Sequence, residues 1–188
     1  MSPRRHRNGP QLTLIRGGLE ARTERAGVQV EVAALDAPAP RLDAVVVEDD
    51  TWTVLSADPQ LNDPGMPLER ALQDAERFQP YAPGTLVVRE EEPLELLAII
   101  HDLDATPSWR EEWIATALEA VFTVAADRVL GTVAMPLLGT IHGRLEPERA
   151  IALLCNALDH QSGGWPRKLW LAVPRKAVRP TLAQIEGG

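Results

Sequence analysis

Residues 135–148 read MPLLGTIHGRLEPE, which is an apolar strand end, a loop with glycines at 139 and 143, and the start of a helix. In α/β proteins, a strand, a glycine-containing loop and a helix in this order form many phosphate sites. Glycine allows a close approach that a Cβ would block, and N–H groups near a helix N-terminus favour an anion. The stretch indicates an α/β fold with a candidate phosphate-binding loop. The same order also joins strands to helices where no ligand binds.

The length and composition predict one globular domain. The 188 residues include 45% hydrophobic and 24% charged residues, which is ordinary for such a domain. No apolar run approaches the roughly 18 residues that a membrane span requires, so we expect no membrane association and a cytoplasmic location. Arg4, Arg5 and Arg7 are not followed by a signal-peptide type of apolar stretch. We therefore expect a mobile basic tail over residues 1–10 and a single domain over residues 11–188.

The charge and the cysteine content restrict the possible partners and cross-links. The net charge of −8 opposes general nucleic-acid binding, because affinity for nucleic acid depends largely on lysine and arginine at the phosphates. The only cysteine, Cys155, excludes an intrachain disulfide. It lies on the apolar side of a predicted helix, so we expect it in the core.

Apolar runs and helix-start signals alternate along the chain. Ser108 and Glu111 predict a helix over 108–130, Pro147 predicts a helix that ends near residue 160, and a shorter helix is predicted over 67–77. The runs at 44–47 and 96–100 lack polar alternation, as expected for strands covered on both faces. Strands are predicted at 12–15, 28–34, 44–47, 52–55, 85–88, 96–100, 132–135 and 169–173.

This alternation predicts the fold class and the location of any ligand site. Strands separated by helices favour a three-layer α/β/α fold with a mixed, mainly parallel central sheet. In such folds ligands bind outside the carboxyl ends of the strands. The loops that follow residues 47, 100 and 135 are therefore the places to search for function.

Several short segments share their order and spacing with one known family. They are MPLLGT at 135–140 followed by Gly143, Leu145 and PERA at 147–150; IIH at 99–101; PGTLVV at 83–88; and DAVV at 43–46, with Asp36 seven residues before Asp43. This arrangement resembles the macro domain family, α/β/α modules that bind ADP-ribose and related nucleotides. The resemblance extends over residues 28–173 and lies in order and spacing more than in identity.

The resemblance implies a nucleotide partner and a set of binding residues. Asp36 would accept a hydrogen bond from the adenine amino group, and Asp50 would approach the distal ribose. The loop would hold the phosphates through Gly139, Thr140, Ile141, His142 and Gly143. His142 has a second interpretation, as an ordinary loop histidine.

The chain also departs from the family pattern. Where the family has Asn-Ala-Ala-Asn, this chain has Val47-Glu48-Asp49-Asp50, and the first glycine-rich phosphate loop is reduced to Asp63-Pro64-Gly65-Met66. Three acidic residues would repel a diphosphate unless their side chains point away or bind a cation. The simplest interpretation of Asp50 is that it belongs to a solvated turn. Adjacent acids on an extended segment alternate in direction, so we predict no metal site and no cofactor.

Three functional hypotheses follow. The first is a diverged macro-like module that binds ADP-ribose or a related nucleotide diphosphate without efficient catalysis. The alternative is a degenerate structural or protein-interaction domain with no nucleotide ligand, which the acidic triplet and the reduced first loop favour. A further alternative is an ADP-ribosyl hydrolase, for which Asp50 is the weak catalytic candidate. The sequence contains no Ser/His/Asp spacing, Cys/His metal pair or phosphate-loop lysine that would support other chemistry.

Overall fold

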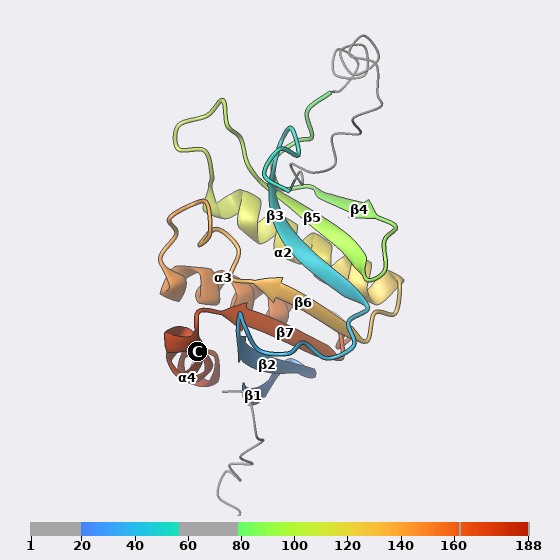
Figure 1. The fold of residues 1–188 in the computed structure, drawn as a ribbon, viewed down its shortest axis with the longest axis vertical. Helices are drawn as coiled ribbons and strands as arrows, with labels where there is room; N and C mark the ends of the chain where they lie inside the picture. Colours follow the sequence, from blue (N-terminus) through green and yellow to red (C-terminus); the bar gives the residue numbers. More distant parts are fainter. Residues whose placement is uncertain (1–19, 57–78, 162, 188) are drawn as a thin grey trace, which may run out of the picture.

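The computed structural model of the protein describes residues 20–56, 79–161 and 163–187, and these form a seven-stranded sheet with helices (Figure 1). The strands are β1 (Glu20–Arg25), β2 (Val28–Ala34), β3 (Ala44–Asp50), β4 (Leu86–Arg89), β5 (Leu94–His101), β6 (Thr132–Pro136) and β7 (Lys168–Val173). The helices are α2 (Glu111–Asp127), α3 (Pro147–His160), the short 3-10 helix η1 (Arg175–Ala177) and α4 (Val178–Gly187). No helix among the described residues is long and apolar enough to cross a membrane.

The sheet order is β1-β2-β7-β6-β3-β5-β4. The edge strands β1 and β4 pair antiparallel with their neighbours, whereas the five strands between them are mutually parallel. The parallel strands place their carboxyl ends at one edge of the sheet, with the loops that follow them. This mixed, mainly parallel sheet confirms the predicted fold class.

The predicted apolar runs form the inner strands, and β2 and the start of α3 have the predicted bounds. The prediction of a strand at 52–55 was wrong, because these residues form a turn. The helix predicted over 108–130 is shorter at both ends. It begins at Glu111 without a side-chain cap, and it ends at Asp127 because Val129 adopts a left-handed conformation with φ of 57°. The predictions for residues 1–10, 12–15 and 67–77 lie outside the described residues.

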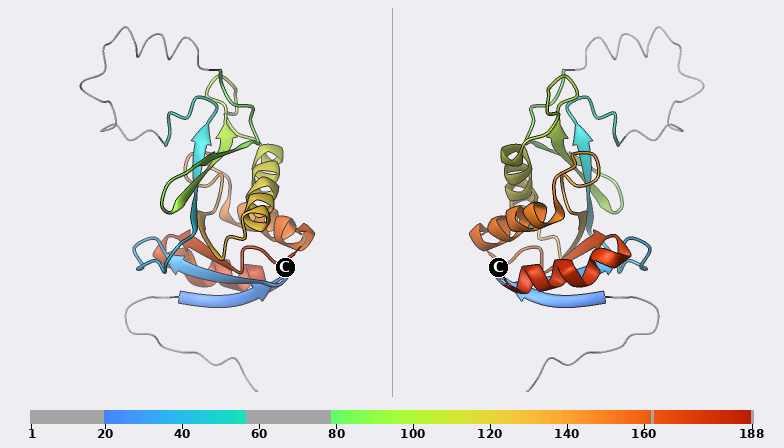
Figure 2. Two further views of the ribbon diagram at one scale, coloured as in Figure 1. Left: turned by 90° about the vertical axis from the view of Figure 1, so that its right-hand side faces the viewer. Right: turned by 90° about the vertical axis from the view of Figure 1, so that its left-hand side faces the viewer.

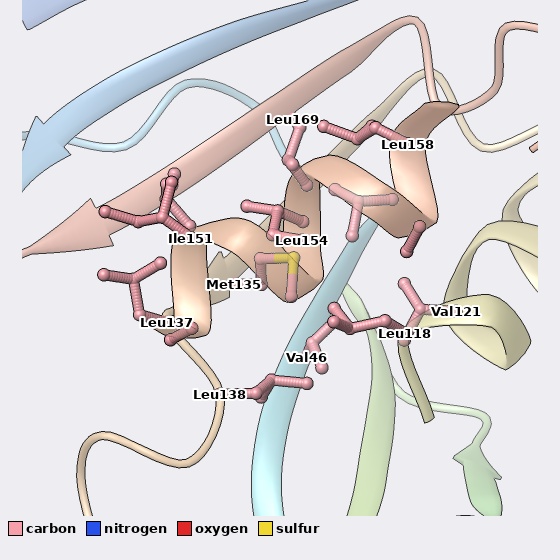
Figure 3. Close-up of a cluster of buried hydrophobic side chains, with 14 of the residues drawn as sticks. Val46, Leu118, Val121, Met135, Leu137, Leu138, Ile151, Leu154, Leu158 and Leu169 are labelled. Carbon is pink, nitrogen blue, oxygen red and sulfur yellow. The ribbon is translucent and has the colours of Figure 1, made fainter. Parts of the chain in front are cut away.

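One face of the sheet carries the main core. Figure 2 shows α2 and α3 on the same side of the sheet, and α4 contributes Val178 and Ile185 to the same buried cluster. Figure 3 shows how α3 places Leu154 close to Met135 of β6. Cys155 is buried in this cluster, which confirms its predicted place in the core. On the opposite face, Ala33, Ala134 and Trp170 form a smaller cluster.

β3 and β6 are neighbours in the sheet, but they pair only where β3 begins, at Ala44 and Val45. Asp43 reinforces this end: its N–H donates to the Thr132 carbonyl at 2.9 Å, and its Oδ2 accepts from the Thr132 N–H at 2.8 Å. Beyond Val45 the two strands diverge (Figure 1). The separation leaves room at the carboxyl edge for side chains from β3 and for the loop after β6.

Candidate functional site

The loop over residues 137–146, between β6 and α3, is tightly folded on itself. The N–H and the hydroxyl of Thr140 both donate to the Leu137 carbonyl, and the Leu145 N–H donates to the Gly139 carbonyl at 3.0 Å. Gly139 has a φ of 84°, and a Cβ there would lie 2.6 Å from Cδ1 of Ile114. The loop conformation therefore requires glycine at position 139.

Gly143 is constrained by space rather than by its backbone angles. A Cβ on Gly143 would lie 2.6 Å from the Gly139 carbonyl oxygen and 3.1 Å from the Trp109 ring. Gly143→Ala should therefore push the two halves of the loop apart and lower the free energy of unfolding by about 2 kcal/mol. Urea denaturation followed by circular dichroism would measure this loss. Gly187→Ala is the control, because a Cβ there meets no atom within 4 Å; equal stabilities for the two variants would contradict the prediction.

Glu48 fills the space beneath the loop. It shares the helix-covered face of β3 with Ala44 and Val46, and it is only 3% exposed. Its Oε1 accepts a hydrogen bond from the Gly139 N–H at 2.7 Å. Its Oε2 accepts a longer hydrogen bond, of 3.4 Å, from the backbone N–H of His142. The loop thus has an anion at its backbone donors, and that anion is a side chain of the protein itself.

His101 is the second buried polar group at this position. It ends β5, is 1% exposed, and its Nε2 lies 3.3 Å from Oε2 of Glu48. The polar partner of the His101 ring is therefore the Glu48 carboxylate. The ring of His142 packs edge-on against His101, with 5.9 Å between centroids. One loop and two strands, β3 and β5, therefore meet around one carboxylate.

Asp50 and its two acidic neighbours are buried, so the interpretation of Asp50 as part of a solvated turn was wrong. Both Asp49 and Asp50 are wholly inaccessible to solvent. Asp49 accepts hydrogen bonds from the Asp50 N–H at 2.8 Å and from the backbone and hydroxyl of Ser56. The physical reason is the supply of donors, because buried carboxylates are stable when enough N–H and O–H groups surround them. No group of three or more potential metal ligands occurs in the described parts of the chain.

Asp50 organises the turn that follows β3. Its Oδ1 accepts from the Trp52 N–H at 2.7 Å, and its Oδ2 accepts from the N–H groups of Val54 and Leu55 at 2.9 Å each. Both oxygens thus hold the backbone of residues 52–55. The predicted contact of Asp50 with a ribose would require it to leave these donors or to share them.

Asp36 lies just beyond the carboxyl end of β2. It is exposed and forms an ion pair with Arg175, which follows β7. The hydrogen bond from the Arg175 guanidinium holds the pKa of the Asp36 carboxyl below its usual range, so the group is ionised at neutral pH. The neighbouring Leu35 exposes 64% of its surface. Asp36 is therefore a charged acceptor next to an exposed apolar side chain.

The predicted binding residues share one edge of the sheet, but they do not form one contact cluster. β7 separates the end of β2, which carries Asp36, from the end of β6 and its loop. Within the loop, Ile141 is 57% exposed and His142 is exposed as well. Among the described residues, none accepts a hydrogen bond from the N–H groups of Ile141 or Gly143. Gly143 is buried, whereas Ile141 is exposed, so the Ile141 N–H is the candidate donor to a ligand.

Several solved structures that resemble this chain are macro domains. The Oceanobacillus iheyensis macrodomain with ADP aligns over 91% of this chain and 96% of that chain, with a TM-score of 0.64 and 11% sequence identity. For the macrodomain of Thermus aquaticus DarG these shares are 77% and 99%, with a TM-score of 0.53 and 19% identity. The macro domain of ganglioside induced differentiation associated protein 2 aligns over 83% and 81%, with a TM-score of 0.57 and 12% identity.

No family model and no curated protein matches the sequence. At identities of 11–19%, the likeness to solved structures establishes the fold and nothing finer. The chain has the macro domain fold, which confirms the resemblance found in the sequence.

The roles of Asp43 and Glu48 were not predicted from the sequence. Asp43 joins β3 to β6 at the amino end of the pair, and Glu48 joins β3 to the loop after β6 at the carboxyl end. A signal for Glu48 was present, because it replaces the first alanine of the family's Asn-Ala-Ala-Asn pattern.

Proposed function

We propose that this protein is a diverged macro-fold module that binds ADP-ribose or a related nucleotide, without efficient catalysis. The observation that carries the proposal is that Asp36 and the loop over 139–143 share one sheet edge, separated by the width of one strand. Neighbouring strands lie about 4.8 Å apart, so the ends of β2 and β6 are about 10 Å apart. An extended nucleotide can bridge that separation, with its base at Asp36 and its phosphates beside the loop.

The chemistry of both ends supports this proposal. Asp36 is ionised and solvent-accessible, so it offers a strong acceptor to an adenine amino group, and Leu35 offers an apolar surface to the ring. At the other end, the N–H group of the exposed Ile141 remains as a donor to an anion. The Oceanobacillus iheyensis macrodomain has been solved with ADP, and a single-residue mutant of it with ADPR. These ligands define the class of molecule to test.

The engagement of Asp50 supports the absence of efficient catalysis. A general base must lie within hydrogen-bond reach of the proton that it abstracts. Asp50 is buried, and its two oxygens accept three backbone hydrogen bonds. The hydrolase hypothesis therefore has no support from the geometry of Asp50.

One observation favours the alternative of a protein-interaction domain with no nucleotide ligand. The Glu48 carboxylate already takes the Gly139 N–H, which is the shortest backbone contact that it makes with the loop. A second anion at the loop would meet both a missing donor and a like charge. This alternative predicts that no adenine nucleotide binds.

Titration calorimetry with ADP-ribose, ADP and AMP distinguishes the two. We expect ADP-ribose to bind, and Asp36→Ala to weaken its affinity about tenfold, because a hydrogen bond to a charged acceptor contributes roughly 1.5 kcal/mol. The control is Glu90→Ala, which breaks a comparable exposed ion pair, with Arg128, at the opposite end of the strands. Absence of heat and of any thermal shift at millimolar concentrations of all three nucleotides would sink the proposal and favour the alternative.

A further inference from the structure

We infer that Glu48 is the specificity-determining residue of this site. Its carboxylate acts as a built-in anion that prevents the loop from holding a phosphate tightly. The inference deepens the proposed function and, as far as it concerns nucleotides, rests on it. The ligand would then bind mainly through its base and ribose. Removing the Glu48 carboxylate would convert the loop into a diphosphate site.

Glu48 already accepts hydrogen bonds from backbone donors of the loop. A phosphate oxygen bound by a loop of this kind accepts hydrogen bonds from successive backbone N–H groups. Here the Gly139 N–H, at 2.7 Å, and the His142 N–H, at 3.4 Å, are directed at the two oxygens of Glu48. A carboxylate and a phosphate offer the same kind of charged acceptor, so Glu48 makes contacts that an incoming phosphate would otherwise make.

The position and the negative charge of Glu48 also oppose a phosphate at the loop. Glu48 enters the gap that opens because β3 and β6 do not pair beyond Val45. The Glu48 carboxylate is buried, but it contacts the backbone of His142, which is exposed, so it lies just beneath the surface. A phosphate on the outside of the loop would therefore meet a negative charge across a single backbone layer. Such proximity with little water between the charges strengthens the repulsion.

The Glu48 carboxylate is held firmly in its position beneath the loop. The carboxylate is held by contacts from three directions, namely Gly139, His142 and the His101 ring. A side chain held by partners from a loop and a neighbouring strand will not swing away for a weakly binding anion. The exclusion of phosphate is therefore a property of the folded protein and does not require a ligand-dependent change.

Pyrophosphate tests the inference without any nucleotide. We expect pyrophosphate to bind Glu48→Ala at least 10-fold more tightly than it binds the unsubstituted protein, as measured by calorimetry. Addition of pyrophosphate should also raise the Tm of Glu48→Ala. Glu48→Gln keeps the shape and an acceptor oxygen but removes the charge, so it should give an intermediate affinity. The control is Glu31→Gln, which removes one negative charge from another buried glutamate, 1% exposed, that pairs with Arg22 and Lys168.

A nucleotide series then locates the effect. In the unsubstituted protein we expect adenosine, AMP and ADP-ribose to bind within about threefold of one another, whereas Glu48→Ala should bind ADP-ribose at least 10-fold more tightly than adenosine. Tight pyrophosphate binding by the unsubstituted protein would overturn the inference. So would folded Glu48→Ala and Glu48→Gln variants that gain nothing over Glu31→Gln. Failure of every adenine compound, with the pyrophosphate gain intact, would count against the proposed nucleotide ligand and not against the role of Glu48.

Discussion

Replacing Asp50 by alanine is expected to lower the free energy of unfolding by about 3 kcal/mol. The substitution leaves the N–H groups of Trp52, Val54 and Leu55 without their acceptor, and each partly buried donor left unpaired costs about 1–3 kcal/mol. Water that reaches the turn would recover part of this, which keeps the total below the sum. Urea denaturation monitored by circular dichroism would measure the change.

The matched control is Asp102→Ala. Asp102 accepts a single backbone hydrogen bond, from Asp104 at 3.0 Å, in an exposed turn, so its loss should cost less than about 1 kcal/mol. Asp50→Asn retains one acceptor oxygen and should fall between the unsubstituted protein and Asp50→Ala. If Asp50→Ala were as stable as the unsubstituted protein, the carboxylate would not be holding the turn. Asp50 would then return as a candidate for ribose contact.

Leu154→Ala is expected to cost about 3 kcal/mol of unfolding free energy. Leu154 is 2% exposed and lies inside the cluster between α3 and the sheet, where Figure 3 shows it close to Met135. Truncation removes apolar atoms and leaves a cavity that close-packed neighbours fill only in part. The midpoint and slope of urea denaturation would give the loss.

Leu153→Ala is the control for this prediction, since it is the same substitution one residue earlier in α3. Leu153 is only partly buried at the margin of the cluster, so its truncation should cost about 1 kcal/mol. Equal losses in the two variants would contradict the assignment of Leu154 to the centre of the core.

The inner strands and the macro domain fold could be predicted from the sequence because their signals are local. Continuous apolar runs such as 44–47 and 96–100 are typical of strands covered on both faces, and the alternation with helices restricts the topology. The edge strand β1, with the sequence EARTER, gave no such signal because it has few apolar residues and is defined by its pairing with β2. α4 was missed although Val178, Leu182 and Ile185 follow a helical spacing, with Pro180 among them.

The acidic triplet could not be predicted in the same way. The hydrogen-bond donor to Glu48 is the N–H group of Gly139, which is 91 residues away in the chain. No sequence pattern near Glu48 therefore encodes its burial. Asp50 differs, because its donors lie two to five residues ahead, and short-range turns of this kind are a known preference of aspartate. The binding roles of Asp36 and of the loop over 139–143 remain predictions.

The short pairing between β3 and β6 divides the sheet into two ribbons, β1-β2-β7-β6 and β3-β5-β4. Beyond Val45 no main-chain ladder connects these two described strands, so their cooperation in folding depends on side chains and on helix α2. Asp43 and Glu48 fasten the two ribbons near opposite ends of β3. Units of this kind can open separately in hydrogen exchange when the contacts between them are few. The loop over 139–143 belongs to one ribbon and Glu48 to the other. A substitution that frees the loop for a ligand would therefore also loosen the mechanical coupling of the whole sheet.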